Sequence, residues 1–133
     1  MLSAVFVVTL ALSACGSDDA SSSSTNAPAN AAVSASGIQL VQPDDAAATI
    51  AAPPDDLVIL DVRTPEEYAE GHIEGAVMID FYRDDFATEL AQLDPDVPYV
   101  LYCRSGSRSG QTRAIMSELG FTAVDDVDGG VIA

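Results

Sequence analysis

The chain of 133 residues contains no lysine and no tryptophan, and its positive charge is confined to five arginines. Against these stand 21 acidic residues, which give a net charge of -16 at neutral pH. Nucleic-acid binding depends on basic patches that meet phosphates, so this balance argues against a nucleic-acid partner. An acidic surface also repels anionic membranes and anionic small molecules. Any site for an anion must therefore be built locally.

Cysteine and histidine are also scarce. Cys15 and Cys103 are too few for a disulfide scaffold, and we expect no disulfide between them. The single histidine, His72, lies in no cluster with metal-ligand spacing, and we expect neither a metal nor another cofactor. The acidic pairs lack a calcium-loop pattern, and we interpret them as solvated turns and element ends. These pairs are Asp44-Asp45, Asp55-Asp56, Asp84-Asp85 and Asp125-Asp126.

The N-terminal segment has the composition of an export signal. Residues 2–14 are apolar or small, and the run is shorter than the roughly 20 residues that a membrane-spanning helix needs. We interpret residues 1–14 as a signal peptide. Leu12-Ser13-Ala14-Cys15 resembles the bacterial lipobox, in which the cysteine is lipid-modified and begins the mature chain. Residues 15–36, rich in Ser, Ala and Asn, are then interpreted as a disordered tether.

This interpretation predicts an exported protein that the lipidated Cys15 anchors to the outer face of the bacterial cytoplasmic membrane. One feature is atypical, because signal peptides begin with positive charge and no basic residue precedes Arg63. Two alternatives stay open: a true start upstream of Met1, or an apolar N-terminus that has nothing to do with export.

From residue 37 to residue 133, short apolar runs alternate with helical patterns, which indicates one α/β domain with a parallel sheet. Strands are predicted at 38–41, 57–60, 76–79, 98–102 and 121–127, and helices at 43–52, 64–70, 84–93 and 107–119. Thr64 and Glu67 form a capping-box pattern around Pro65, which marks the start of the second helix. The buried stripe of the last helix is expected to comprise Thr112, Ile115, Met116 and Leu119.

The polar residues after the second predicted strand are interpreted as structural. Asp61 and Arg63 follow the apolar run directly, and we expect Arg63 to pair with an acid such as Glu67 or Glu70. His72 lies between a helix end and a strand, where a structural role is favoured over that of a general base.

The segment from Tyr102 to Ser109 carries the chemistry, with the sequence Tyr-Cys-Arg-Ser-Gly-Ser-Arg-Ser. Cys103 follows an apolar strand and precedes a loop of small residues, two arginines and a helix. Turn N–H groups, a helix N-terminus and nearby positive charge all favour a thiolate, which is the reactive form of cysteine. We therefore interpret Cys103 as a nucleophile. The alternative is a small buried hydrophobic residue at a strand end.

Four segments at compatible spacing resemble the rhodanese family. They are Leu60–Tyr68, Gly71–Ala76, Tyr102–Ser109, and Gly120-Phe121 together with Asp128–Val131. The resemblance covers residues 38–133 and implies a parallel five-stranded sheet flanked by helices, with sulfur transfer through a persulfide on Cys103. It also implies a further C-terminal helix containing tryptophan, which this sequence lacks. If residue 133 is the natural end of the chain, we expect apolar surface to remain exposed beside the last strand.

The resemblance places the sulfur-binding loop at Arg104, Ser105, Gly106, Ser107 and Arg108, with Ser109 opening the helix. The Cys103 thiolate would attack the outer sulfur of a donor such as thiosulfate or a polysulfide, and a thiol or cyanide would then take the sulfur from the persulfide. Loop amides would stabilise the anion, and Arg104 or Arg108 would hold the donor. Gly106 is expected where a side chain would obstruct the loop.

Two other functions are open to a reactive cysteine in such a loop. Cysteine phosphatases of related fold need five residues between the cysteine and the arginine, whereas four separate Cys103 from Arg108, so this loop suits a sulfur atom better than a phosphoryl group. A non-catalytic persulfide carrier or sulfur-handling binding module remains the alternative to an enzyme. The expected partners are a small anionic sulfur donor and a thiol or cyanide acceptor.

Overall fold

The computed structural model describes residues 37–132. The interpretations of residues 1–36 as a signal peptide, a lipid-modified Cys15 and a tether fall outside the described residues. Within residues 37–132, no helix combines the length and the apolar character that crossing a membrane would require.

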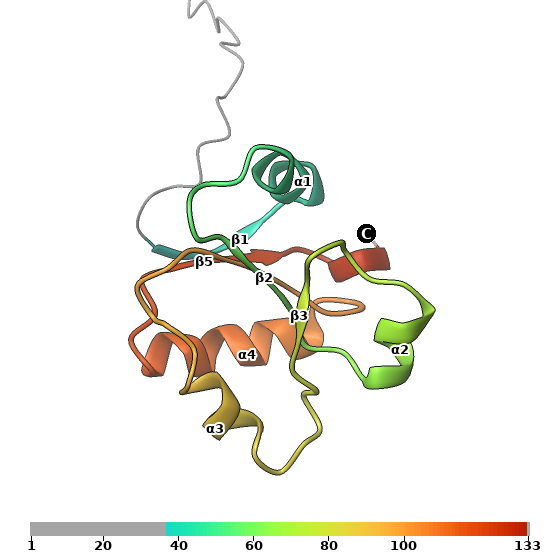
Figure 1. Ribbon diagram of the computed structural model, residues 1–133, viewed down its shortest axis with the longest axis vertical. Coiled ribbons are helices and arrows are strands. Elements are labelled where there is room, and N and C mark those ends of the chain that lie inside the picture. The colour runs from blue at the N-terminus through green and yellow to red at the C-terminus, as the bar shows by residue number, and fades with distance from the viewer. Residues whose placement is uncertain (1–36, 133) are drawn as a thin grey trace, which may run out of the picture.

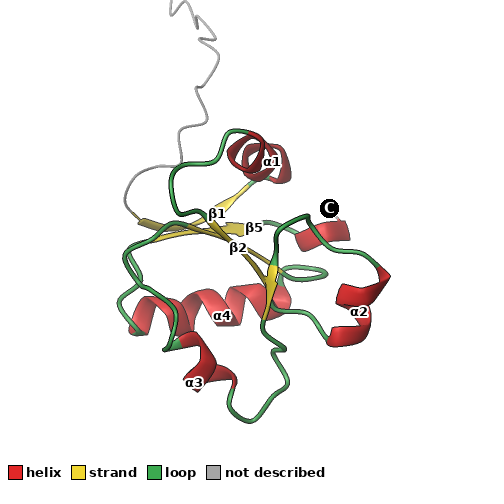
Figure 2. Cartoon of the chain, in the orientation of Figure 1, coloured by secondary structure: helices red, strands yellow, loops and turns green. Residues whose placement is uncertain are grey.

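Five parallel strands form one sheet in the order β1-β5-β4-β2-β3, which confirms the predicted α/β class. Helix α1 covers one face of this sheet, α3 and α4 cover the other, and α2 lies to the side near β3 (Figure 1). Figure 2 shows how loops connect these layers. The elements are β1 Gly37–Val41, α1 Pro43–Ala51, β2 Val58–Asp61, α2 Pro65–Glu70, β3 Val77–Met78, α3 Phe86–Leu90, β4 Tyr99–Tyr102, α4 Ser107–Glu118, β5 Ala123–Val127 and the short 3-10 helix η1 Gly130–Ile132.

The sheet buries apolar side chains on both faces. Leu101 and Met116 belong to the larger core on the α3 and α4 side, whereas Val100 and Tyr102 belong to the smaller core under α1. Successive β4 residues thus point to opposite faces, and all four are buried. Such a continuous apolar strand is typical of a parallel sheet that is covered on both sides. Because β4 is fixed by two cores, the residue that follows it, Cys103, is held in a defined position.

The predicted cap of α2 is confirmed. Thr64 Oγ accepts a hydrogen bond from the Glu67 N–H at 3.3 Å, and the Glu67 carboxylate accepts one from the Thr64 N–H at 3.2 Å. Pro65 takes an early helical position, where its missing N–H costs nothing. The cap therefore fixes where the Glu67 carboxylate lies.

Two expectations about exposure are wrong. Asp125 and Asp126 are buried within β5 instead of lying in a solvated turn, because β5 sits between β1 and β4 and both of its faces are covered. The other three acidic pairs are exposed, as expected. Leu119 is 39% exposed and does not extend the buried stripe, because α4 ends one residue earlier, at Glu118.

The expected partner of Arg63 is also wrong. Its guanidinium pairs with Asp61, Nη2 to Oδ2 at 2.7 Å, and not with Glu67 or Glu70. It also donates to the Gly71 carbonyl at 2.7 Å. Arg63 turns back on the strand it follows because the Asp61 carboxylate is fully buried and needs a counter-charge. The structural interpretation of this pair is thereby supported.

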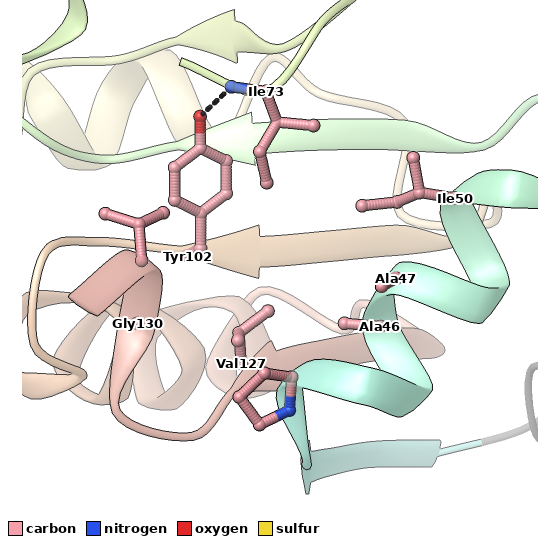
Figure 3. A pocket seen from close by; sticks show the side chains of 9 residues that line it. Ala46, Ala47, Ile50, Ile73, Tyr102, Val127 and Gly130 are labelled. Carbon is pink, nitrogen blue, oxygen red and sulfur yellow. Dashed lines mark hydrogen bonds between the residues drawn. The ribbon is translucent and has the colours of Figure 1, made fainter. Parts of the chain in front are cut away.

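An apolar cavity of about 320 Å³ opens between α1 and the end of the described chain. The labelled side chains in Figure 3 show it between α1 and the Tyr102 ring, whose hydroxyl accepts a hydrogen bond from the Ile73 N–H at 3.3 Å. Nearby, Val131 is 42% exposed and Ile132 is 65% exposed. Exposed apolar side chains therefore lie close to the end of β5. The lining residues are Pro43, Ala46, Ala47, Ile50, Ile73, Tyr102, Val127, Gly130 and Val131.

Candidate active site

The loop between β4 and α4 folds around the sulfur of Cys103. Cys103 Sγ accepts a hydrogen bond from the Gly106 N–H at 3.1 Å, and the thiol donates to Ser109 Oγ at 3.5 Å. The side chain has no exposed surface, so a reactant can reach the sulfur only when neighbouring atoms move. The structure therefore brings together the thiol and the loop amide that the sequence predicted.

The pKa of the Cys103 thiol reflects two opposing effects. Burial by itself would raise the pKa, because it disfavours the charged thiolate. Hydrogen bonds from the Ser109 hydroxyl and from the backbone N–H groups of Ser109, Ser105 and Gly106 oppose burial. Their combined effect wins, and the pKa falls below the ordinary value for a thiol. The loop thus favours the nucleophilic form of Cys103.

Two glycines permit this loop, and the sequence pointed to only one of them. Gly106 has φ of +86°, a left-handed conformation that favours glycine, although a Cβ there would meet only the Gly129 backbone at 3.4 Å. The tighter position is Gly130, with φ of +64°, where a Cβ would overlap the Cys103 carbonyl oxygen and lie 2.7 Å from the Arg104 carbonyl carbon. The closest obstruction therefore lies at Gly130, not at Gly106.

Arg108 is committed to an ion pair with α2. Its Nη1 and Nη2 donate to the two carboxylate oxygens of Glu67 at 2.6 and 2.9 Å, and both side chains are mostly buried. The Arg108 guanidinium holds the pKa of Glu67 down, from 4.5 to about 2. It also lies over the Tyr82 ring, 5.7 Å from the centroid. Arg108 thus ties the start of α4 to the capped start of α2, a role the sequence did not reveal.

Arg104 lies on the outer side of the loop. It is exposed, and within residues 37–132 its guanidinium makes no ion pair. It lines a small polar cavity of about 190 Å³ together with Arg63, Glu67, Glu70, Val131 and Ile132. Of the two arginines proposed to hold an anion, Arg104 is therefore the one whose charge is available.

The three loop serines differ in their surroundings. Ser105 and Ser107 are exposed, whereas Ser109 is fully buried in the first turn of α4 beside the thiol. His72 contacts Tyr68 of α2. Its ring stacks on the Tyr68 ring with centroids 3.6 Å apart, and its Nδ1 lies 2.9 Å from the Tyr68 carbonyl oxygen. This packing agrees with the structural interpretation of His72.

Sequence reasoning missed two site residues. Glu67 was expected as a cap and as a candidate partner of Arg63, and its distance of 41 positions from Arg108 hides the pairing that the structure shows. Asp126 was placed on the surface, yet it is fully buried in β5, near Arg113 and Ser109 of α4. Strand alternation is the signal that could have placed Asp126, since it lies two residues after the buried Val124.

The fold and site define an α/β domain in which a central parallel strand delivers a thiol into an anion-stabilising loop. Residues 42–133 match the family model described as "Rhodanese-like domain". The chain therefore belongs to the rhodanese-like sulfurtransferase family.

Named relatives and solved structures agree with this assignment. The chain is 36% identical over 70 residues to the thiosulfate sulfurtransferase PspE of Escherichia coli, covering 53% of this chain and 67% of that protein. It is 42% identical over 79 residues to the putative sulfurtransferase YtwF of Bacillus subtilis, covering 59% and 74%. A rhodanese-like domain protein from Staphylococcus aureus superposes with a TM-score of 0.62 at 26% identity, covering 71% of this chain and 89% of that one.

Proposed function

We propose that the protein is a sulfurtransferase that moves sulfane sulfur from a donor such as thiosulfate to a thiophilic acceptor through a persulfide on Cys103. The observation that carries this proposal is the loop itself. Its Gly106 N–H points at Cys103 Sγ from 3.1 Å, and its hydrogen bonds lower the pKa of a buried thiol. The name of the PspE relative, a thiosulfate sulfurtransferase, supports thiosulfate as the donor to test.

The proposed reaction has two displacements at sulfur. The Cys103 thiolate attacks the outer sulfur of thiosulfate, a new S–S bond forms, and sulfite leaves with the electron pair of the broken bond. The terminal sulfur of the persulfide then carries the negative charge, which the loop N–H groups stabilise as they do the thiolate. An acceptor thiolate or cyanide attacks this outer sulfur and releases the Cys103 thiolate. Neither step needs a metal or an external oxidant.

Arg104 is the residue we assign to the anionic donor. Its charge is not neutralised by a carboxylate in the described part of the chain, and it lies directly after the nucleophile. A guanidinium can hold two oxygens of thiosulfate by parallel hydrogen bonds. Arg108 contributes indirectly, because its pairing with Glu67 fixes the start of α4 and hence the loop.

One observation favours the second candidate, a persulfide carrier that acts only with a protein partner. Cys103 is completely buried, so small donors and acceptors have no direct path to the sulfur. A partner that displaces the loop side chains could provide such a path. In that case Cys103 would accept or deliver sulfur in a complex, without appreciable turnover on free thiosulfate and cyanide.

Mass spectrometry of the intact protein tests the persulfide step. After incubation with thiosulfate and removal of excess donor, we expect a gain of one sulfur atom, about 32 Da, on the wild-type chain and none on Cys103→Ser. Thiocyanate formation on addition of cyanide then separates an enzyme from a carrier. An unmodified wild-type protein would reject thiosulfate as the donor, and a loaded protein that does not turn over would favour the carrier.

We also propose that the chain is exported and held at the outer face of the cytoplasmic membrane by lipid on Cys15. The support is the lipobox-like Leu12–Cys15 after an apolar run, followed by a polar stretch. Labelling with a radioactive fatty acid in a bacterial host tests this: label should appear on the wild-type chain and disappear in Cys15→Ser. Absence of label on the wild type would exclude lipidation in that host.

A further inference from the structure

Asp126 is a buried acid that sulfur transfer, as described above, leaves without a role. It lies in β5 with no exposed surface, and within residues 37–132 neither of its carboxylate oxygens makes a hydrogen bond. Its positive neighbour is Arg113, whose Nε lies 3.6 Å from Oδ2 and whose side chain is 32% exposed. A buried carboxylate with so few partners is costly to a fold. We therefore looked for a role of the Asp126 carboxylate among the groups that surround it.

Ser109 connects this acid to the nucleophile. It lies on α4, four residues before Arg113, so both side chains stand on the same face of the helix. The register pairs Asp126 with Leu101, which belongs to the core on the α4 side, and thus places the carboxylate on the face that α4 covers. Ser109 Oγ lies 3.5 Å from Cys103 Sγ. The Ser109 hydroxyl also acts to lower the pKa of the Asp126 carboxyl, although the two form no hydrogen bond in this structure.

A serine hydroxyl has a single proton to donate. In this structure Ser109 donates it to the Gly106 carbonyl at 3.3 Å, but the thiolate and the carboxylate are both candidate acceptors. When Asp126 is ionised, it competes for that proton, and its charge opposes a second negative charge on Cys103. When Asp126 is protonated, it can donate to Ser109 Oγ, which leaves the serine proton free for the thiolate.

We propose that Asp126 is a positioning residue for the nucleophile, which acts through the Ser109 hydroxyl so that the carboxyl and the Cys103 sulfur share one negative charge. The inference rests on the proposed function only in taking Cys103 as the reactive group. Two interacting acids of this kind titrate as a coupled pair.

The surroundings of Asp126 are consistent with a shared charge. Burial raises the pKa of its carboxyl, Ser109 and Arg113 of α4 lower it, and the nearby Asp128 raises it. The net effect is a pKa above the ordinary value for an aspartate. The register neighbours Leu101 of β4 and Leu40 of β1 bring no charge.

The test compares the titration of Cys103 in the full chain carrying Cys15→Ser, so that Cys103 is the sole thiol. Thiolate absorbance and the rate of alkylation by iodoacetamide are followed against pH. Asp126→Asn should lower the apparent pKa of Cys103 by at least about half a unit, which raises the thiolate fraction about threefold at lower pH. No sulfur donor is used, so the result is independent of whether thiosulfate is a substrate.

A matched control is Asp125→Asn, which removes the same charge from the adjacent residue. Asp125 pairs in register with Gln39, accepts a hydrogen bond from its side chain at 2.8 Å, and points to the opposite face. It should leave the Cys103 titration within about 0.2 units of the parent. An unchanged or raised pKa in Asp126→Asn, or an equal shift in Asp125→Asn, would overturn the proposal.

Two further measurements address the route and the risk of misfolding. In a Ser109→Ala background the effect of Asp126→Asn should fall by more than half, and an undiminished effect would refute the route through Ser109. If Asp126→Asn does not fold, Cys103→Ser supplies the reciprocal test. Carboxyl NMR should then show Asp126 titrating in two steps in the parent and in one step in Cys103→Ser, and identical titrations would refute the coupling.

Discussion

The ion pair between Glu67 and Arg108 gives the sharpest test of how the loop is held. We consider Glu67→Gln, which removes the charge but keeps a residue that can complete the capping box with Thr64. The Arg108 guanidinium lowers the pKa of Glu67 from 4.5 to about 2. At about 1.4 kcal/mol per pH unit, this difference corresponds to about 3.5 kcal/mol. Because the pair retains some solvent contact, screening reduces the expected loss to about 2 kcal/mol at pH 7.

The sign of the pH dependence follows from the direction of the shift. Glu67 has a lower pKa folded than unfolded, so its contribution is complete above about pH 5 and is lost as the pH falls toward 2. Wild-type protein and Glu67→Gln should therefore differ by about 2 kcal/mol at pH 7. About half of that difference should be gone by pH 3.

Urea unfolding followed by far-ultraviolet circular dichroism measures this difference, since the chain has no tryptophan for fluorescence. Glu66→Gln is the matched control, because Glu66 is exposed in the same turn of α2 and should change stability by less than about 0.5 kcal/mol. A gap between wild type and Glu67→Gln that is equal at pH 3 and pH 7 would refute the reasoning. So would a gap below about 0.5 kcal/mol at pH 7.

Three further outcomes are expected. Gly130→Ala should lower the free energy of unfolding by about 2 kcal/mol or more, because the new Cβ would overlap the Cys103 carbonyl. Gly110→Ala, in α4 where a Cβ meets open space, should instead raise it by about 0.5–1 kcal/mol. Thermal unfolding measures both. Arg104→Gln should raise the KM for thiosulfate about tenfold with little change in melting temperature, and Arg83→Gln, which removes an arginine paired with Asp85, should leave KM unchanged. Raising the salt concentration from about 10 mM to about 150 mM should increase kcat/KM for thiosulfate, because salt screens the repulsion between the net charge of -16 and an anion. A kcat/KM that falls with salt would contradict this.

The parts of the fold that could be predicted are those that depend on residues close together in the sequence. The apolar run that becomes β4 and the capping box at Thr64 each depend on residues within a few positions, so the structure confirms them. The thiol loop is local as well, because a strand, small residues and a helix follow one another around Cys103. The helix predicted at 84–93 is shorter, Phe86–Leu90, because the residues on either side of it form single hydrogen-bonded turns that do not continue the helix.

Other contacts join residues that lie far apart in the sequence and could not be predicted from local patterns. Arg104 or Arg108 was expected to hold the donor. The ion pair between Arg108 and Glu67 joins α4 to α2 across 41 sequence positions, so no local pattern indicates it. Asp125-Asp126 has the composition of a turn, but the position of β5 between β1 and β4 in the sheet overrides that local preference. Here the strand's place in the sheet decides burial, and the carboxylate of Asp126 is enclosed beside Ser109 as a result.

The site stabilises an anion in a protein whose own charge opposes one. Among residues 37–132, four arginines are paired with carboxylates, and Arg104 is the one that is not. The charge on the Cys103 sulfur must therefore be balanced mainly by short-range N–H and hydroxyl donors, which solvent salt screens poorly. It follows that salt acts on the encounter with the donor and the loop acts on the ionisation of the Cys103 thiol. Salt would change the rate at which the proposed anionic donor reaches the site, whereas the loop, through Gly106 and Ser109, sets the fraction of Cys103 that is thiolate.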